Sequence, residues 1–150
     1  MSSQSYRSGE NLRIEIVNAH PKTRLRHQPF QDHVRNVLQW GNVNKGEIVV
    51  ILLDDEELLR MNQEFLNHDY YTDVITFPLE ADPLEGEIYI SLDRAREQGK
   101  ERSIGLYEEV SRLVIHGTLH LLGYDDGTQE EREEMTRLEN MFLTGGIQKG

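Results

Sequence analysis

Four short stretches of the chain show the patterns that are typical of β-strands. In residues 11–18, Leu12, Ile14 and Ile16 alternate with polar residues, which predicts a half-buried strand. Residues 46–54 are a continuous apolar run, which predicts an interior strand covered on both faces. Two more strands are predicted in TDVITFPL and GEIYISLD, separated by the turn-prone segment EADPLEG. Together these strands predict a small sheet.

Most of the remaining chain places apolar residues three and four positions apart, the period of an amphipathic helix. The predicted helices cover residues 29–40, 55–66, 91–99, 104–122 and 128–143. Asp54 and Glu57 resemble a capping box at the start of the second helix, and Thr128 is the predicted N-cap of the last one. Residues 104–122 are apolar on two opposite sides, so this helix is expected to be buried.

These elements predict one α/β (α+β) domain. We expect a small, mostly parallel mixed sheet of about four strands with helices packed on it. A chain of 150 residues is long enough to bury a core of its own. The domain is expected to span residues 11–150, and the polar residues 1–10 are expected to be a disordered tail.

Composition narrows the class of protein. The chain has no cysteine and no apolar run of membrane-spanning length, and its start lacks a signal-peptide core, so a soluble cytoplasmic protein is expected. The net charge is −11, made up of +3 in residues 1–50 and −14 in residues 51–150. This excess of acid argues against indiscriminate coating of nucleic acid. The best candidate for a local basic groove is PKTRLRH, residues 21–27, although the sequence alone favours a solvated loop for this segment.

The stretch HGTLHLLGYDD contains a candidate metal site. His116 and His120 are four residues apart, so on a helix both imidazoles can reach one point. Gly123 permits the left-handed turn that would end the helix and bring Asp126 to the same point. The pattern predicts a site of two histidines and one carboxylate, with Asp125 as an alternative ligand or a second-layer residue. Glu109, two turns before His116, is interpreted as a surface acid.

Gly117 separates this motif from that of the zinc peptidases. In HExxH enzymes a glutamate occupies this position and takes a proton from the metal-bound water, which glycine cannot do. A metal ion could still support hydrolysis through its bound water, and a phosphodiester is a suitable substrate because the metal neutralises charge on its oxygens.

Several motifs, at matching separations, resemble the YbeY family of bacterial metal-dependent endoribonucleases. They are HGTLHLLGYDD, the preceding SRLVI, the following EEREEMTRLE, and TDVITFPL, GEIYIS and EQGK. The resemblance covers about residues 12–143. It implies a single α/β domain that cleaves single-stranded RNA, acts in 3′-end maturation of small-subunit ribosomal RNA and in ribosome quality control, and works in the cytoplasm with the ribosome as a partner. It implies neither a membrane nor DNA as a partner.

Carried over to this chain, the family's three metal ligands are His116, His120 and Asp126, where most members have histidine at the third position. One zinc ion is the expected cofactor, with manganese, iron or cobalt as alternatives because a carboxylate makes the site harder. Many members carry an arginine six residues before the threonine of the TDV strand, where this chain has Leu66. Arg60 or His68 could supply that charge. No catalytic residue is therefore assigned.

Asp73 of the TDV segment also matches the family, and its expected role is to fix the start of a strand through side-chain hydrogen bonds.

The leading hypothesis is a metal-dependent RNA hydrolase whose cleft is rimmed by basic residues from the first fifty. A metallopeptidase-like hydrolase and a ribosome assembly or RNA-binding factor with a structural metal are the alternatives. An iron oxygenase is disfavoured because its ligands usually come from a β-barrel core, whereas two of these lie on one helix.

Overall fold

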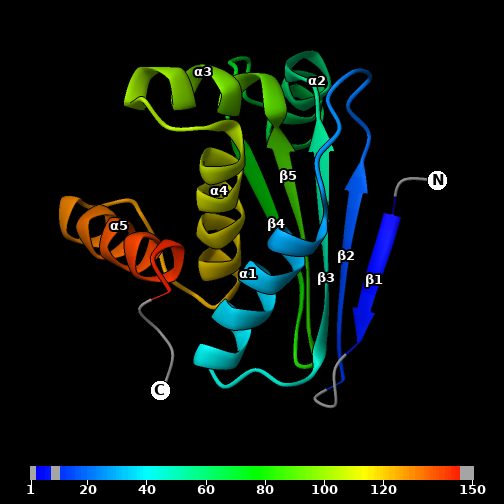
Figure 1. The fold of residues 1–150 in the computed structure, drawn as a ribbon, viewed down its shortest axis with the longest axis vertical. Coiled ribbons are helices and arrows are strands. Elements are labelled where there is room, and N and C mark those ends of the chain that lie inside the picture. The colour runs from blue at the N-terminus through cyan, green and yellow to red at the C-terminus, as the bar shows by residue number, and fades with distance from the viewer. Residues whose placement is uncertain (1–2, 8–10, 146–150) are drawn as a thin grey trace.

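The computed structural model describes residues 3–7 and 11–145 and shows, within them, one mixed sheet with helices packed on it (Figure 1). The strands are β1 (Ser3–Arg7), β2 (Leu12–Asn18), β3 (Gly46–Leu53), β4 (Val74–Ala81) and β5 (Leu84–Ser91). The helices are α1 (Gln28–Trp40), α2 (Asp55–Leu66), α3 (Leu92–Arg102), α4 (Leu106–Leu121) and α5 (Gln129–Leu143). The predicted α+β class is confirmed.

The sheet has the strand order β1-β2-β3-β5-β4, one strand more than predicted. The pairings β2 with β3 and β3 with β5 are parallel, and the outer pairings of β1 and β4 are antiparallel. The extra strand corrects the prediction of a disordered tail for Ser3–Arg7, while residues 1, 2 and 8–10 lie outside the described residues. An edge strand needs only the free backbone groups of its neighbour, so a polar segment can pair without any apolar signal.

One face of the sheet carries the main core. Helices α1 and α4 pack there against the inward-facing apolar residues of β2, β3 and β5. The opposite face is covered by α2 only near the carboxyl ends of the strands, where Leu58 and Met61 meet Leu53 and Ile75. The interior strand predicted at residues 46–54, which is β3, was expected to be covered on both faces. This holds only for its last part, because Glu47 near its start is exposed.

Helix α4 is buried on two sides, as predicted. Val110 and Val114 face the sheet and α1, whereas Ile115 and Leu119 face α5. Helix α5 covers this second side with residues that are almost fully buried: Met135, Leu138 and Phe142. The polar edge of α4 between these two contacts is where its histidines lie.

The predicted element ends differ from the structure in two places. Helix α3 continues past Gly99 to Arg102, because Ser103 takes the left-handed conformation and its N–H bonds back to the carbonyls of the last turn. Strands β4 and β5 extend through the predicted turn and leave only residues 82 and 83 between them. None of the described helices is both long and apolar enough to cross a bilayer.

Candidate metal centre

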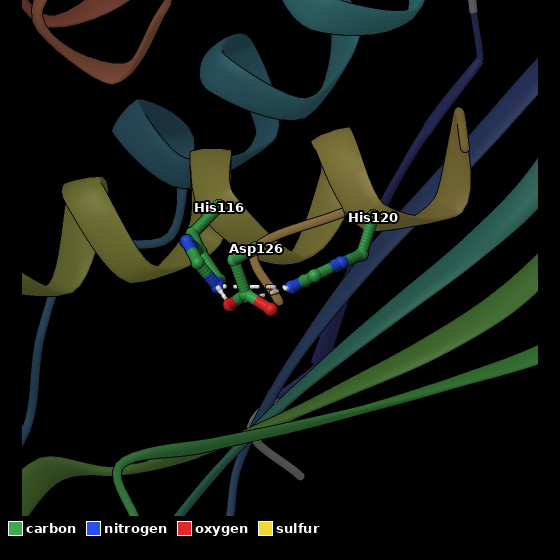
Figure 2. Close-up of side chains that lie close together, drawn as sticks. All are labelled: His116, His120 and Asp126. Carbon is green, nitrogen blue, oxygen red and sulfur yellow. Dashed lines mark hydrogen bonds and ion pairs between the residues drawn. The ribbon is translucent and has the colours of Figure 1, made fainter. Parts of the chain in front are cut away.

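His116 and His120 point from neighbouring turns of α4 toward Asp126, as Figure 2 shows. The Nε2 atoms of the two histidines are 3.0 Å apart. Each Nε2 lies 3.3 Å from Oδ2 of Asp126. The three residues selected from the sequence therefore meet at one point.

The loop that brings Asp126 to the histidines begins with a glycine in a left-handed conformation. Gly123 has φ of 103°, which residues with a side chain rarely adopt, and it follows Leu122, the C-cap of α4. The loop ends at Thr128, which caps α5 in a reciprocal capping box with Glu131. Arg132 donates to the carbonyls of Asp126 and Gly127 at 3.4 and 3.1 Å. These contacts fix the position of Asp126 between two helices.

The three ligand atoms fit a divalent metal ion. Ligands held about 2.1 Å from a tetrahedral zinc ion are about 3.4 Å from one another. The separations of 3.0 to 3.3 Å are close to that value. Two imidazole nitrogens and one carboxylate oxygen suit zinc, and also manganese, iron and cobalt, and leave further coordination positions for water and substrate.

Residues behind the metal ligands orient the imidazole of His116. Nδ1 of His116 donates to Oε2 of the nearly buried Glu139 at 2.7 Å, so its Nε2 is left with the lone pair that a metal requires. Arg112 donates to Oε1 of Glu139 at 3.0 Å and to Oδ1 of Asn140 at 2.9 Å. Sequence reasoning missed Glu139, although a charged residue beside Leu138 on the apolar side of the last helix was a usable signal.

The protonation of His116 reflects the same contacts. Burial disfavours its charged form, but the hydrogen bond to Glu139 and the charges of Glu139, Asp126 and Asp73 favour it, so its pKa is raised above the ordinary value. Metal and proton therefore compete for His116, and binding should weaken in acid.

Packing explains why position 117 is a glycine, in addition to the effect of that glycine on the chemistry of the site. A Cβ atom at this position would lie 2.7 Å from Cγ2 of Ile88 and 3.1 Å from Oγ1 of Thr76. Position 117 thus faces the sheet and packs directly against β4 and β5. A glutamate there would require the helix or the Ile88 side chain to move.

The metal centre lies where two cavities meet. The first cavity, of about 290 Å³, has Arg102, Arg112 and Arg132 among its lining residues, and the second, of about 450 Å³, includes Thr72, Thr76 and Asp125. The residues common to both are His116, Asp126, Asp73 and Val74. None of the described residues lining either cavity comes from the first fifty, so the predicted origin of the basic rim is wrong. The arginines come from three helices of the second half.

Glu109 also differs from its prediction. It is fully buried rather than on the surface, lines the first cavity, and accepts from Arg102 at 3.1 and 3.4 Å. Burial raises its pKa, although Arg102 and Arg112 oppose that shift.

Asp73 accepts a side-chain hydrogen bond from Gln98 of α3 at 3.2 Å, and its backbone carbonyl accepts from the N–H of Ser91 at 3.0 Å. Both contacts hold the start of β4 against neighbouring elements, and the carboxylate also faces both cavities.

Comparison with known proteins identifies the family. The family model described as Endoribonuclease YbeY matches residues 15–145. The chain belongs to the YbeY family. It is 40% identical over 111 residues to Endoribonuclease YbeY of Bacteroides thetaiotaomicron, covering 73% of this chain and 81% of that protein. It is also 40% identical over 131 residues to Endoribonuclease YbeY of Chlorobium phaeobacteroides, covering 87% and 92%.

A solved structure shares the YbeY fold of this chain. The solution structure of TM1509 from Thermotoga maritima matches it with a TM-score of 0.60 and 26% identity, and 90% of each chain is covered.

The YbeY resemblance left open which residue supplies a positive charge in place of the family arginine. Leu66, Arg60 and His68 are all absent from the lining of both cavities. Arg60 pairs with Glu57 and with Glu64 on the surface of α2. The positive charges beside the metal centre are instead those of Arg102, Arg112 and Arg132, which the sequence did not single out.

Proposed function

We propose that this protein is a zinc-dependent endoribonuclease that cleaves single-stranded RNA. The observation that carries the proposal is that the triad His116, His120 and Asp126 lies where two cavities meet, one of which contains three arginines. Membership of a family whose members are named endoribonucleases supports the same activity.

The residues of the site would have distinct roles in this reaction. The triad would hold one zinc ion, and Glu139 would keep the Nε2 atom of His116 directed at it. When bound, zinc would lower the pKa of a coordinated water and neutralise charge on a phosphodiester. The arginines would attract the polyanionic strand. Since Gly117 offers no base beside the first ligand, another carboxylate, hydroxide or a basic group of the substrate would have to accept the proton.

We further propose that the substrate is precursor ribosomal RNA and that the enzyme acts in 3′-end maturation of the small-subunit RNA and in ribosome quality control. The ribosome or its small subunit would be the partner, and the cytoplasm the location. The resemblance to the YbeY family supports this role, and the absence of cysteine suits a reducing compartment.

Cleavage of single-stranded RNA by zinc-loaded, chelated and zinc-restored protein tests the activity, with casein as an alternative substrate. Chelation and His116→Ala should each lower RNA cleavage by about two orders of magnitude or more, because a metal contributes several kcal/mol to the transition state. His68→Ala is the matched control, since this histidine lines neither cavity. Cleavage that survives both chelation and His116→Ala would sink the proposal, and cleavage of casein in place of RNA would favour the peptidase alternative.

Elemental analysis of protein purified without chelating resin tests the metal. One zinc per chain is expected, and loss of it in Asp126→Ala would support Asp126 as the third ligand. Stoichiometric manganese, iron or cobalt in its place would contradict the choice of zinc.

A further inference from the structure

The two cavities that meet at the metal centre differ in charge. The first contains Arg102, Arg112 and Arg132, whereas no lysine or arginine is present among the described residues that line the second. The second is lined by hydroxyl and carboxyl groups of Thr72, Thr76 and Asp125. A strand that crosses the metal centre would therefore meet positive charge on one side of it only.

The three arginines of the first cavity have different partners. Arg112 is largely buried and is held by Glu139 and Asn140, so its function is to support the ligand His116. Arg102, at the end of α3, pairs with the buried Glu109 but keeps 54% of its side chain exposed. Arg132, on α5, is exposed and donates only to two backbone carbonyls; among the described residues it has no carboxylate partner. Arg102 and Arg132 can thus each donate to an incoming anion.

The net charge of the first cavity depends on the metal. Three arginines face the four carboxylates of Asp73, Glu109, Asp126 and Glu139, which leaves one negative charge when the histidine is neutral. A divalent ion at the triad changes this to one positive charge. An anion should therefore bind in the cavity when the metal is present and be repelled when it is absent.

We propose that Arg102 and Arg132 form a subsite for the backbone phosphate next to the scissile phosphate of single-stranded RNA. This subsite rests on the proposed function, in which the scissile phosphate lies at the metal. The cavity of about 290 Å³ holds many times the volume of a water molecule, about 30 Å³, so a phosphate and its solvent can be accommodated. Guanidinium groups suit this ligand because their paired N–H donors match phosphate oxygens. The subsite places one flanking nucleotide by its phosphate, whereas the nucleotide on the other side meets the hydroxyl and carboxyl groups of the second cavity.

Binding of a fluorescent 2′-O-methyl oligonucleotide, checked by gel to remain intact, tests the subsite without requiring cleavage. With zinc-loaded protein, Arg132→Gln should weaken binding about tenfold at low salt, the effect of losing one charge-assisted contact. The slope of log affinity against log salt should fall in magnitude by about 0.7, the value for one phosphate contact on a single strand. Arg102→Gln should act in the same direction. Chelation of the wild type should weaken binding as well.

Two variants separate a phosphate contact from an effect on the Asp126 loop. Arg132→Lys keeps the charge and should retain the wild-type salt slope, although it lacks the guanidinium fork. Arg137→Gln removes an arginine from the same helix that pairs with Glu134 and lines neither cavity, and should match the wild type. Zinc content is measured for each variant, and only fully loaded proteins are compared.

The outcomes distinguish this proposal from the proposed function. If the wild type cleaves RNA with zinc but Arg132→Gln and Arg102→Gln bind with unchanged affinity and salt slope, the subsite is overturned and the activity stands. If the variants weaken binding as expected but no zinc-loaded protein cleaves RNA, Arg102 and Arg132 are phosphate contacts of a binding protein, and both the nuclease function and the position of the subsite beside a scissile phosphate are overturned. If the zinc-loaded wild type does not bind the oligonucleotide, both are overturned.

Discussion

At the scale of single residues, Glu139 links the ligand His116 to Arg112 by short hydrogen bonds on both of its oxygens. Glu139→Gln would keep the size of the side chain but remove the charge that orients His116 and strengthens Nε2 as a ligand. We expect zinc affinity to fall by about 10- to 100-fold, the usual effect of losing such a partner. Competition with a chromophoric chelator measures this affinity.

Glu134→Gln is the matched control for Glu139→Gln. It lies on the same helix, but its carboxylate pairs with Arg137 at the surface. Its zinc affinity should equal that of the wild type, and equal affinities for all three proteins would contradict a role for Glu139 in positioning the ligand.

Glu109 predicts a pH dependence of stability. Because burial raises its pKa in the folded state, its contribution to stability is fully present below its ordinary pKa and is lost as the pH rises through the folded value. Glu109→Gln cannot ionise, so its melting temperature should rise relative to the wild type as the pH increases from acid to neutral. Thermal melts of chelated protein across that range measure the difference.

Glu97→Gln provides the comparison for Glu109→Gln, since the Glu97 side chain is 72% exposed. The difference between this variant and the wild type should change little with pH. A difference for Glu109→Gln that is equally constant would show that ionisation of Glu109 costs the fold nothing.

At the scale of elements, the closeness of α4 to β5 depends on Gly117. In Gly117→Ala the new Cβ would lie 2.7 Å from Cγ2 of Ile88, and such overpacking costs about 1–3 kcal/mol. Alanine also gains about 1 kcal/mol of helix propensity over glycine. We expect a net destabilisation of up to about 2 kcal/mol in urea unfolding. In an Ile88→Ala background the contacts with Ile88 are removed and only the 3.1 Å approach to Oγ1 of Thr76 remains, so the same substitution should become much less destabilising or neutral; destabilisation of equal size in both backgrounds would contradict this origin.

Local patterns predicted most elements because their signals lie within the elements themselves. The start and end of α2 follow from Asp54, whose side chain accepts from the N–H of Glu57, and from a left-handed Asn67. The apolar residues on two sides of α4 predicted its burial between the sheet and α5. Strand β1 could not be predicted in this way, because its pairing depends on the free edge of β2 rather than on an apolar pattern of its own.

At the scale of the whole molecule, site residues that local structure brings together could be predicted from the sequence. Those that meet only through the packing of distant elements could not. The triad spans only residues 116–126, so helix periodicity and one glycine turn sufficed to bring it together. Arg102, Arg112 and Arg132 come from three helices, and α5 bears Glu139, so these residues meet only through the packing of α3, α4 and α5 shown in Figure 1. Local periodicity says nothing about such packing, and the basic rim was therefore assigned to the wrong half of the chain.

Because the triad joins α4 to the loop that leads into α5, zinc should stabilise the whole fold. A ligand at 100 times its dissociation constant adds about 2.7 kcal/mol if it binds only the folded state. The unfolded chain has no cysteine and so offers few strong zinc ligands. For a chain of this length the gain corresponds to a rise in melting temperature of about 5–10 °C. Thermal melts of chelated and zinc-restored protein measure it. His116→Ala should show no response to zinc, and a wild-type melting temperature that does not change with zinc would contradict binding at this site. In Asp126→Ala, a lower melting temperature with RNA binding nearly intact would favour a structural metal, whereas loss of cleavage before any loss of stability would favour a catalytic one.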